Sequence, residues 1–262
     1  MNWYRTAFGP HYRRLYAHRD EHEAAACVAA IAPWLPSRRG PVVDLGCGAG
    51  RHLSPLAAHG AWGVALDLSA DLLAEAAHVA GAVALPPVRA DMRCLPLRDG
   101  SCAAVLSLFT SFGYFGDLDD HAPLLREIAR VLAPGGRWCL DHLNAFAVRR
   151  ELAAGDVVRE RRLGACLVRE QRRLGPGGRR VLKDVRIRPL GGANGQASVD
   201  GVPPQGLDYT ESVALFAPEE LDALCRAAGL VRVAEFGGYD GRSFDAEAAE
   251  RWLLIYEREA RP

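Results

Sequence analysis

The sequence predicts an α/β fold: a seven-stranded, mostly parallel, doubly wound sheet with a reversed last strand and a small antiparallel β insertion. Short apolar runs alternate with longer helical segments between residues 41 and 143, which is typical of a parallel sheet with helices on both faces. A glycine-rich turn follows the first run. Beyond residue 157 the alternation breaks into shorter strand-like runs, and these predict the antiparallel insertion.

Each element is predicted from a local pattern. Short apolar, β-branched runs predict buried strands over 41–45, 64–68, 83–89, 103–108 and 137–143. Helical spacing or composition predicts helices over 12–34, 51–59, 69–80 and 121–132, the last ended by Pro134-Gly135-Gly136. In the insertion, Gly175-Pro176-Gly177-Gly178 predicts a hairpin of 165–174 and 180–190. A helix over 218–228 and strands over 230–236 and 252–256 complete the pattern.

Composition and charge argue against several classes of protein. The 262 residues carry 32 basic and 32 acidic side chains, so the average charge gives no reason to expect nucleic acid or an anionic membrane as partner. No run approaches the roughly 18 apolar residues of a membrane span, and the first residues lack the apolar stretch of a secretory signal. The seven cysteines are scattered, without a Cys-x-x-Cys pair. We therefore expect reduced thiols, no metal site and a cytoplasmic protein.

The turn after the first strand reads Asp44-Leu45-Gly46-Cys47-Gly48-Ala49-Gly50. Glycines here let the backbone approach a ligand closely where a helix begins. The dinucleotide fingerprint Gly-x-Gly-x-x-Gly needs a third glycine where this chain has Arg51. The carboxylate of Asp44 is placed for a cationic amine rather than for a pyrophosphate. On its own, the loop leaves NAD and a purely structural turn as alternatives.

Two further acidic residues indicate a nucleoside. Asp67 ends the second strand, where its carboxylate can accept from both ribose hydroxyls and Leu68 can pack on adenine. Asp91 follows the third strand and can accept from the adenine amino group, while the backbone N–H of Met92 can reach a ring nitrogen. An acidic residue placed for the ribose, as Asp67 is, also occurs in NAD proteins. Asp91 with Met92, placed for adenine, is the feature that distinguishes this chain from them.

This ordered series, together with the turn Arg130–Arg137 ("RVLxPGG" with Ala at x), resembles the class I, Rossmann-like family of S-adenosylmethionine (SAM)-dependent methyltransferases of small-molecule type. The resemblance covers residues 40–145 closely. It implies SAM as cofactor, with S-adenosylhomocysteine as product, and backbone contacts from the glycine loop. The residues it implies for cofactor binding are Asp44, Gly46, Cys47, Gly48, Gly50, Asp67, Leu68, Asp91, Met92, Leu108 and Tyr16. It also implies one domain over 1–262, with a helical lid over 1–36 and an antiparallel cap over 145–216, between strands five and six.

The acceptor side carries weaker signals. Base-methylating members carry Asn/Asp-Pro-Pro-Tyr/Phe or a Pro-Cys nucleophile after the fourth strand, and this chain has neither. Its rings there, Phe109, Phe112, Tyr114 and Phe115, either line an apolar pocket, stabilise a cation or belong to the core, with Tyr114 the best pocket candidate. His142, on the fifth strand, is the best candidate for a general base, although a structural role fits it as well.

Two other segments offer residues to the pocket. In the lid, Tyr12, Tyr16, His18 and Arg19 either close over the methionine end, face the acceptor or belong to a plain surface helix. At the end of the insertion, Tyr209 and Glu211 can also reach the pocket.

We therefore expect in-line methyl transfer to nitrogen, oxygen or carbon of a small molecule, by a monomer or homodimer. One alternative is an RNA methyltransferase, because residues 149–188 carry 13 Lys and Arg against five Asp and Glu and could follow a phosphate backbone. A solvated face explains the same charges. The other alternative is a SAM-binding protein without catalysis.

Overall fold

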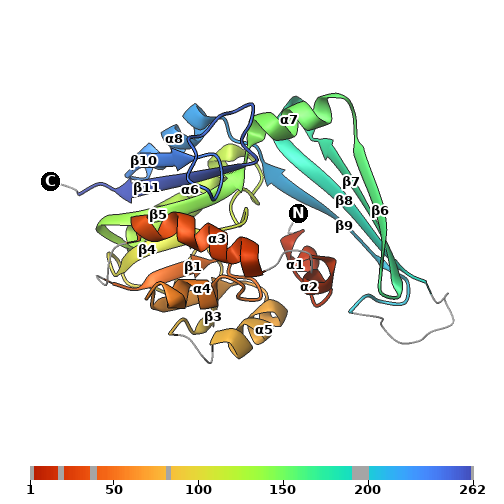
Figure 1. The fold of residues 1–262 in the computed structure, drawn as a ribbon, viewed down its shortest axis with the longest axis horizontal. Helices are drawn as coiled ribbons and strands as arrows, with labels where there is room; N and C mark the ends of the chain where they lie inside the picture. The colour runs from red at the N-terminus through yellow and green to blue at the C-terminus, as the bar shows by residue number, and fades with distance from the viewer. Residues whose placement is uncertain (1–2, 17–20, 36–39, 81–83, 191–200, 261–262) are drawn as a thin grey trace.

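The computed structural model describes residues 3–16, 21–35, 40–80, 84–190 and 201–260, which form two separate sheets (Figure 1). The larger sheet has seven strands in the order β10-β11-β5-β4-β1-β2-β3. β11 runs antiparallel to both of its neighbours, and the other pairings are parallel. The strands are β1 (Val42–Leu45), β2 (Gly63–Asp67), β3 (Pro87–Arg89), β4 (Cys102–Ser107), β5 (Leu132–Leu143), β10 (Leu230–Phe236) and β11 (Arg251–Arg258). The predicted doubly wound sheet with a reversed last strand is confirmed.

Helices cover both faces of this sheet. On one face the buried residues of α3 (Glu21–Ile31), α4 (Leu53–Ala58) and α5 (Ala70–Ala80) share an apolar cluster with β1, β4 and β11. On the other face α6 (Ala122–Val131) and α8 (Pro218–Ala227) form a second cluster. Burial of these two faces is the main favourable term that holds the layers together.

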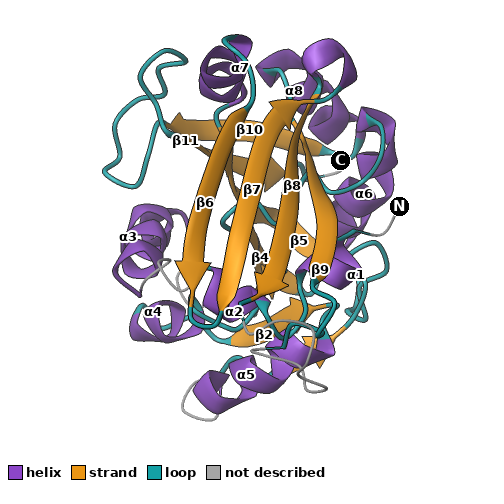
Figure 2. Cartoon of the chain, turned by 90° about the vertical axis from the view of Figure 1, so that its right-hand side faces the viewer, coloured by secondary structure: helices purple, strands orange, loops and turns teal. Residues whose placement is uncertain are grey.

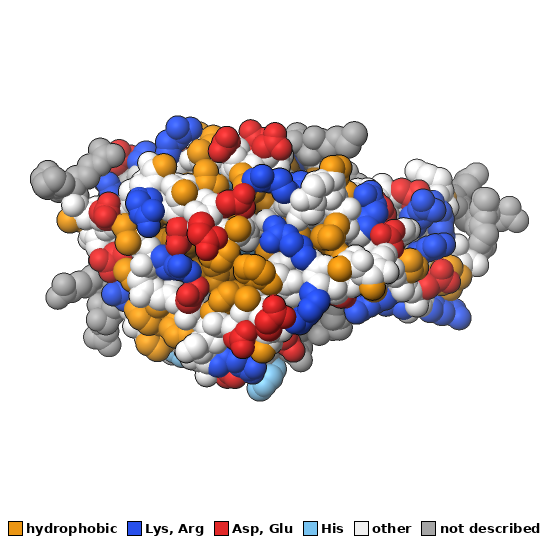
Figure 3. All heavy atoms as spheres, turned by 90° about the horizontal axis from the view of Figure 1, so that it is seen from above, with side chains coloured by type: hydrophobic (Ala, Val, Ile, Leu, Met, Phe, Trp, Pro, Cys, Tyr) orange, Lys and Arg blue, Asp and Glu red, His pale blue; other side chains and the backbone are white. Residues whose placement is uncertain are grey.

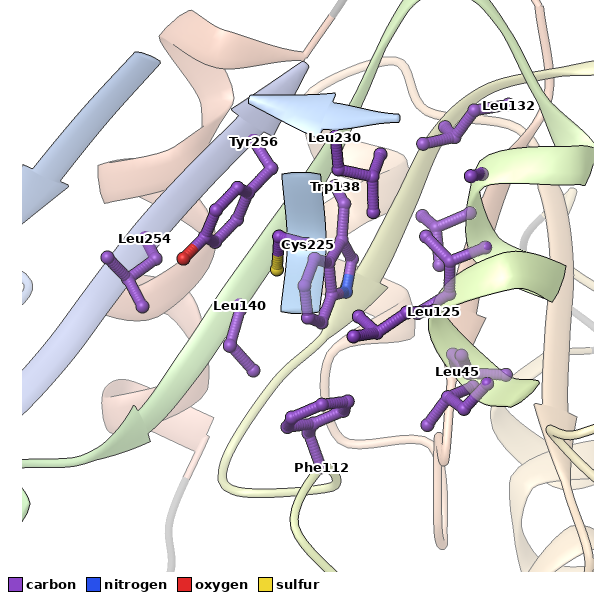
Figure 4. Close-up of a cluster of buried hydrophobic side chains, with 14 of the residues drawn as sticks. Leu45, Phe112, Leu125, Leu132, Trp138, Leu140, Cys225, Leu230, Leu254 and Tyr256 are labelled. Atoms are coloured by element: carbon purple, nitrogen blue, oxygen red, sulfur yellow. The ribbon is translucent and has the colours of Figure 1, made fainter. Parts of the chain in front are cut away.

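Trp138 lies at the centre of the second cluster (Figure 4). Its ring is fully buried, stacks on Tyr256 with centroids 5.4 Å apart, and meets Phe112 edge-on at 5.2 Å. Its indole N–H donates to the hydroxyl of Ser107 at 3.0 Å, so the one polar atom of the side chain is satisfied.

The smaller sheet is antiparallel, in the order β6-β7-β8-β9, and forms a second layer beside the first (Figure 2). Its strands are β6 (Val157–Leu163), β7 (Cys166–Leu174), β8 (Arg180–Pro189) and β9 (Leu207–Ala214). The predicted hairpin is present, with the 3-10 turn η3 (Pro176–Gly178) between β7 and β8. Two short helices, α1 (Tyr4–Ala7) and α2 (Tyr12–Leu15), lie between the two sheets (Figure 1).

Some local expectations are wrong. The expected helix over 12–34 is α2, α3 and the 3-10 helix η1 (Ala32–Trp34), with 17–20 outside the described residues. Helix α7 (Ala145–Ala153) was not expected; the Asn144 side chain caps it by accepting from two backbone N–H groups.

Pro134-Gly135-Gly136 does not end a helix, because β5 already starts at Leu132. The turn lies inside that strand, where the pairing with β4 shifts register. The short 3-10 helix η2 (Leu118–His121) precedes α6.

The seven cysteines are all free thiols, and Cys94 alone among them is exposed. In the part of the chain that the structure describes, no helix has the length and apolar character to cross a membrane. The same residues contain no group of three His, Cys, Asp or Glu side chains placed to hold a metal ion.

Replacement of Trp138 by alanine is expected to lower the free energy of unfolding by about 3–5 kcal/mol, because it leaves a large cavity between α6, α8 and the sheet. Urea denaturation monitored by circular dichroism measures the change. Trp62→Ala is the matched control: its ring is 48% exposed, and its removal should change stability by less than about 0.5 kcal/mol. Equal losses in the two variants would contradict the assignment of the core.

Candidate active site

A cavity of about 640 Å³ opens at the carboxyl ends of the parallel strands, beside α1 and α2. Its wall includes ten of the residues selected from the sequence: Gly46, Cys47, Gly48, Asp67, Leu68, Asp91, Met92, Leu108, Tyr16 and Tyr114. Asp44, Gly50 and His142, which were also selected, are not part of its wall. Parallel strands bring their carboxyl ends to one edge, so residues from four separate loops meet there.

The glycine loop is fixed by its contact with the next strand. Gly46 has a φ of +76°, and its N–H donates to the Leu66 carbonyl at 2.7 Å. A Cβ atom on Gly46 would lie 2.8 Å from the Cβ of Ser111, so only glycine fits here. The Ser111 hydroxyl in turn donates to the Leu45 carbonyl at 2.8 Å. The close packing of these two loops leaves the peptide edges of Gly46–Gly48 facing the cavity.

Asp67 joins the glycine loop to the second strand end. Its two carboxylate oxygens accept from the backbone N–H groups of Gly48 at 2.9 Å and Ser69 at 2.8 Å. Burial raises the pKa of this carboxyl, although both hydrogen bonds favour its charged form. Each oxygen keeps a further lone pair for a ligand hydroxyl. The expected role on a ribose is compatible with this geometry.

Asp91 and Met92 line the cavity on the β3 side. The Arg93 guanidinium donates to both oxygens of Asp91, at 3.0 and 2.7 Å, and these bonds hold the pKa of that carboxyl below its usual range. The carboxylate is therefore charged and fixed in direction, as a partner for an amino group must be.

Two buried polar atoms next to the glycine loop find no hydrogen-bond partner among the described residues: Asp44 Oδ2 and His52 Nε2. Asp44 is 1% exposed; burial, followed by the charge of Asp67, raises its pKa to about 7. His52 is 4% exposed and lines the cavity; burial, followed by the charge of Arg51, lowers its pKa to about 3. Unsatisfied buried polar groups are rare, and these two, on residues at the start and just beyond the end of the glycine loop, indicate the place of a polar ligand.

Arg51 supplies a positive charge at the same end of the cavity. Its Nη1 lies 2.8 Å from Glu23 Oε2, and its Cζ lies 4.1 Å from the centre of the Phe109 ring. From the sequence, Arg51 stood out only because it occupies the place of the third glycine of the NAD fingerprint. His52 was not predicted to belong to the site. The available signal was a pair of basic side chains directly after the glycine loop.

The backbone after β4 is strained. Phe109 and Thr110 have φ values of +54° and +65°, in the left-handed region that residues with a Cβ rarely adopt. Buried Asp141 holds this turn: its Oδ2 accepts from the Phe109 N–H at 2.8 Å and its carbonyl accepts from the Thr110 N–H at 2.8 Å. Arg251 of β11 pairs with Asp141 at 2.8 Å and donates to the Thr110 hydroxyl, while Tyr239 donates to Asp141.

Six aromatic side chains form one wall of the cavity: Tyr4, Phe8, Tyr12, Tyr16, Tyr114 and Phe115. They contact one another, with ring centroids 5.1 Å apart for Phe8 and Tyr12, 4.7 Å for Tyr12 and Tyr16, and 5.6 Å for Phe8 and Tyr114. We call these six residues the aromatic wall. Phe109 also lines the cavity, whereas Phe112 belongs to the core.

His142 points away from the cavity. It shares the face of β5 that carries Trp138 and packs against Phe112 and Phe216, with 1% of its surface exposed. Burial lowers the pKa of His142 to about 4, and its Nδ1 lies 3.2 Å from the Leu143 carbonyl. This placement favours the structural role that the sequence left open. His18 and Arg19 lie outside the described residues.

The smaller sheet touches the cavity through Tyr16. The Tyr16 hydroxyl donates to Glu211 Oε1 at 2.7 Å and accepts from Lys183 Nζ. Lys183 also pairs with Glu211 Oε2 at 2.7 Å and lies 4.6 Å from the centre of the Tyr16 ring. Glu211 therefore reaches the cavity through Tyr16, while Tyr209 packs against His11 behind it.

Part of the sequence, including the glycine loop, is similar to a known protein family. Residues 42–136 match the model of a family described as a methyltransferase domain. Over 96 residues the chain is 43% identical to a demethylmenaquinone methyltransferase of Mycolicibacterium vanbaalenii and 40% identical to that of Corynebacterium efficiens. These alignments cover 37% of this chain, and 39% and 38% of the two relatives. The chain therefore aligns with well under half the length of the curated relatives it matches.

Solved structures match over nearly the whole chain. The CcbJ methyltransferase from Streptomyces caelestis has a TM-score of 0.78 at 22% identity, covering 98% of this chain and 99% of that one. KedS8, a sugar N-methyltransferase from Streptoalloteichus, has a TM-score of 0.67 at 22% identity, with coverage of 95% and 93%. SAM-bound CalS10, an amino pentose methyltransferase from Micromonospora echinaspora, has a TM-score of 0.61 at 22% identity, with coverage of 94% and 96%. The likeness shows a common fold that includes both sheets.

Arg251→Met is expected to lower the free energy of unfolding by about 3–5 kcal/mol, because it leaves the charge of Asp141 buried without its partner. Urea denaturation measures the loss. The control is Arg242→Met, which removes an exposed pair with Asp240 and should cost less than about 1 kcal/mol. A small effect of Arg251→Met would show that other contacts hold the strained turn.

Proposed function

Because this chain carries a class I, Rossmann-like methyltransferase domain, we propose that it is a SAM-dependent methyltransferase that acts on a small-molecule acceptor. The observation that carries this proposal is the composition of the single continuous cavity of about 640 Å³. One part is lined by polar groups suited to a nucleoside and an amino acid, and the adjoining part by the aromatic wall. A cofactor and an acceptor placed in the two parts lie in contact, as direct transfer requires.

The polar part fits SAM at three places. Asp67 would hold the ribose hydroxyls, and Asp91 with Met92 would hold adenine. Asp44 Oδ2 and His52 Nε2 are buried without a partner among the described residues, and both residues adjoin the glycine loop where the methionine end would be, with His52 alone of the two in the cavity wall. Asp44 would pair with the amino group, and Arg51 with His52 would receive the carboxylate.

When bound, SAM supplies a methyl group activated by a positive sulfonium. The residues of the chain contribute by placing the acceptor and excluding water, since alignment alone supplies much of the rate in such reactions. The faces of the aromatic wall favour positive charge next to them. Burial, followed by the charges of Tyr12 and Glu211, raises the pKa of Tyr114, so its hydroxyl stays protonated and positions rather than deprotonates the acceptor. His142 lies outside the cavity and takes no part in this proposal.

The two flanking segments complete the pocket in this proposal. Residues 1–36 serve as a helical lid, because α1 and α2 supply Tyr4 and Tyr12, and the residues directly after these helices, Phe8 and Tyr16, supply two more of the six rings of the aromatic wall. Residues 145–216 serve as a cap, since β9 contacts Tyr16 through Glu211. Amino sugars are the acceptors named for two similar structures, which supports a small molecule of comparable size here. A cytoplasmic location and a monomeric or homodimeric state remain predictions.

The charges of the insertion do not favour RNA. Most of its arginines are engaged within the protein: Arg172 with Glu151, Arg173 with Asp184, and Arg179 with Glu220 at 2.8 to 3.0 Å. Arg180 donates to backbone carbonyls, and Arg188 pairs with Asp208. Seen from above, basic and acidic side chains are interspersed rather than gathered into a basic surface (Figure 3). Few positive charges are left for a phosphate backbone, whose affinity depends on such contacts.

Calorimetry tests the cofactor assignment. S-adenosylhomocysteine is expected to bind, 5′-methylthioadenosine to bind at least about tenfold more weakly because it lacks the amino-acid end, and NAD not to bind. Transfer of tritiated methyl from SAM to a panel of small acceptors then tests turnover. Binding of NAD without S-adenosylhomocysteine would refute the proposal, and binding without any transfer would support the non-catalytic alternative.

Binding of S-adenosylhomocysteine is expected to strengthen as pH rises from 5.5 to 7.5. Burial raises the pKa of Asp44 to about 7, so the unbound carboxyl is mostly protonated at pH 5.5 and must lose that proton to pair with the amino group of the ligand. The ionised fraction rises by about 20-fold over this range, and the affinity should follow it. Asp44→Asn should flatten the profile measured by calorimetry. A wild-type profile as flat as that of 5′-methylthioadenosine would contradict this role.

A further inference from the structure

We propose that the acceptor is an amine and that Glu211, acting through Tyr16, is the carboxylate that receives its proton. This inference rests on the proposed function, because it concerns the part of the same cavity that adjoins the cofactor.

The position of Glu211 is the first argument. It lies on β9, and its Oε1 accepts from the hydroxyl of Tyr16, a member of the aromatic wall, at 2.7 Å. The charge of Glu211 also influences the pKa of residues that line the cavity. Burial, followed by the charge of Glu211, raises the pKa of Tyr16 well above its usual value, and Glu211 also contributes to the raised pKa of Tyr114. The hydroxyl of Tyr16 therefore links the aromatic wall to a carboxylate whose charge is paired with Lys183.

The composition of the aromatic wall is the second argument. Its six members are tyrosines and phenylalanines, and the charged residues that the cavity wall holds outside the cofactor assignment, Glu21 and Glu75, are both acidic. Ring faces attract a cation. An ammonium ion gains from them, and it can pass a proton through Tyr16 to Glu211, whose charge is otherwise paired with Lys183. A neutral hydroxyl gains nothing from the ring faces.

The chemistry of nitrogen requires a proton acceptor at this place. An alkylamine enters as an ammonium ion and has no lone pair for attack until it loses a proton. In the proposed step the N–H bond breaks and its electron pair stays on nitrogen. The proton passes to Tyr16 Oη while the Tyr16 O–H proton passes to Glu211 Oε1, so Tyr16 ends the step unchanged and Glu211 is neutral. The step exchanges an ion pair for two neutral groups, which a water-poor pocket favours.

The surrounding charges allow Glu211 to become neutral. Lys183, the only lysine of the chain, pairs with Glu211 at 2.7 Å and lies 3.7 Å from a second carboxylate, Glu170. Arg161 lies 3.8 Å from the same Glu170. When Glu211 takes up a proton, Lys183 still has Glu170 as counter-ion. Lys183 therefore keeps a carboxylate partner in both states, while the net charge of the cluster rises by one when Glu211 is protonated.

The experiment uses protein saturated with S-adenosylhomocysteine and two probes of the same shape, cyclohexylamine and cyclohexanol. Calorimetry at pH 7.5 is expected to show the amine binding at least about tenfold more tightly than the alcohol. In Glu211→Gln the two affinities should come within about twofold of each other. Glu211→Asp should retain the preference, and Tyr16→Phe should weaken it. Glu160→Gln, on the exposed side of the same small sheet, is the matched control and should behave as wild type.

Each outcome decides between the two proposals. If S-adenosylhomocysteine does not saturate the protein, the proposed function fails and this inference with it. If it binds but the amine and the alcohol bind equally, or neither binds, the amine assignment fails while the cofactor assignment stands. If Glu211→Gln binds S-adenosylhomocysteine as wild type does and still prefers the amine, the carboxylate is not the group that recognises it.

Discussion

The buried carboxylate of Asp141 is the point on which the geometry of the site depends. It lies on β5, accepts the backbone of Phe109 at the end of β4, and pairs with Arg251 at the start of β11. The reversed strand therefore has a local function besides completing the sheet. Because β11 runs antiparallel to β5, its first residue lies opposite Leu143, beside the carboxyl ends of the parallel strands. Only a reversed strand delivers a side chain from its beginning to that edge, and Arg251 is the side chain delivered.

The strained turn that results shapes both parts of the cavity. Left-handed φ values at Phe109 and Thr110 are costly unless the surroundings fix them, and Asp141 does so by accepting from both backbone N–H groups. With the turn fixed, Phe109 faces Arg51 on the cofactor side, and Ser111 packs against Gly46. The chain then continues into Tyr114 and Phe115 on the acceptor side. A single ion pair at the carboxyl edge of the sheet thus sets the positions of residues in both parts of the cavity wall.

The fold and most of the cofactor side could be predicted from the sequence, because strand ends in a parallel sheet meet at one edge whatever lies between them. Asp67 and Asp91 could be placed by that rule alone. The orientation of His142 could not be predicted in this way, because it depends on how side chains alternate along β5. His142 lies on the same face of β5 as Trp138 and packs against Phe112 of the core. Arg51 and His52 were not predicted, because only the structure shows that Arg51 pairs with Glu23 and that His52 Nε2 is buried without a partner among the described residues. Helix α7 was missed because its cap, Asn144, ends a strand at the same place.

The basic insertion shows why a charge count is a poor guide to a partner. The excess of arginine in residues 149–188 suggests a polyanion, yet the acids that neutralise these arginines come partly from elsewhere in the chain, such as Glu220 and Asp208. Ion pairs between residues that are distant in the sequence cannot be predicted from the charge of one segment. Lys183, the one lysine of the chain, also pairs with residues distant in the sequence: Tyr16 lies 167 residues away and Glu211 lies 28 residues away. Lys183 and Arg180 both join the smaller sheet to the wall of the cavity: Lys183 donates to the Tyr16 hydroxyl, and Arg180 donates to the Phe115 carbonyl.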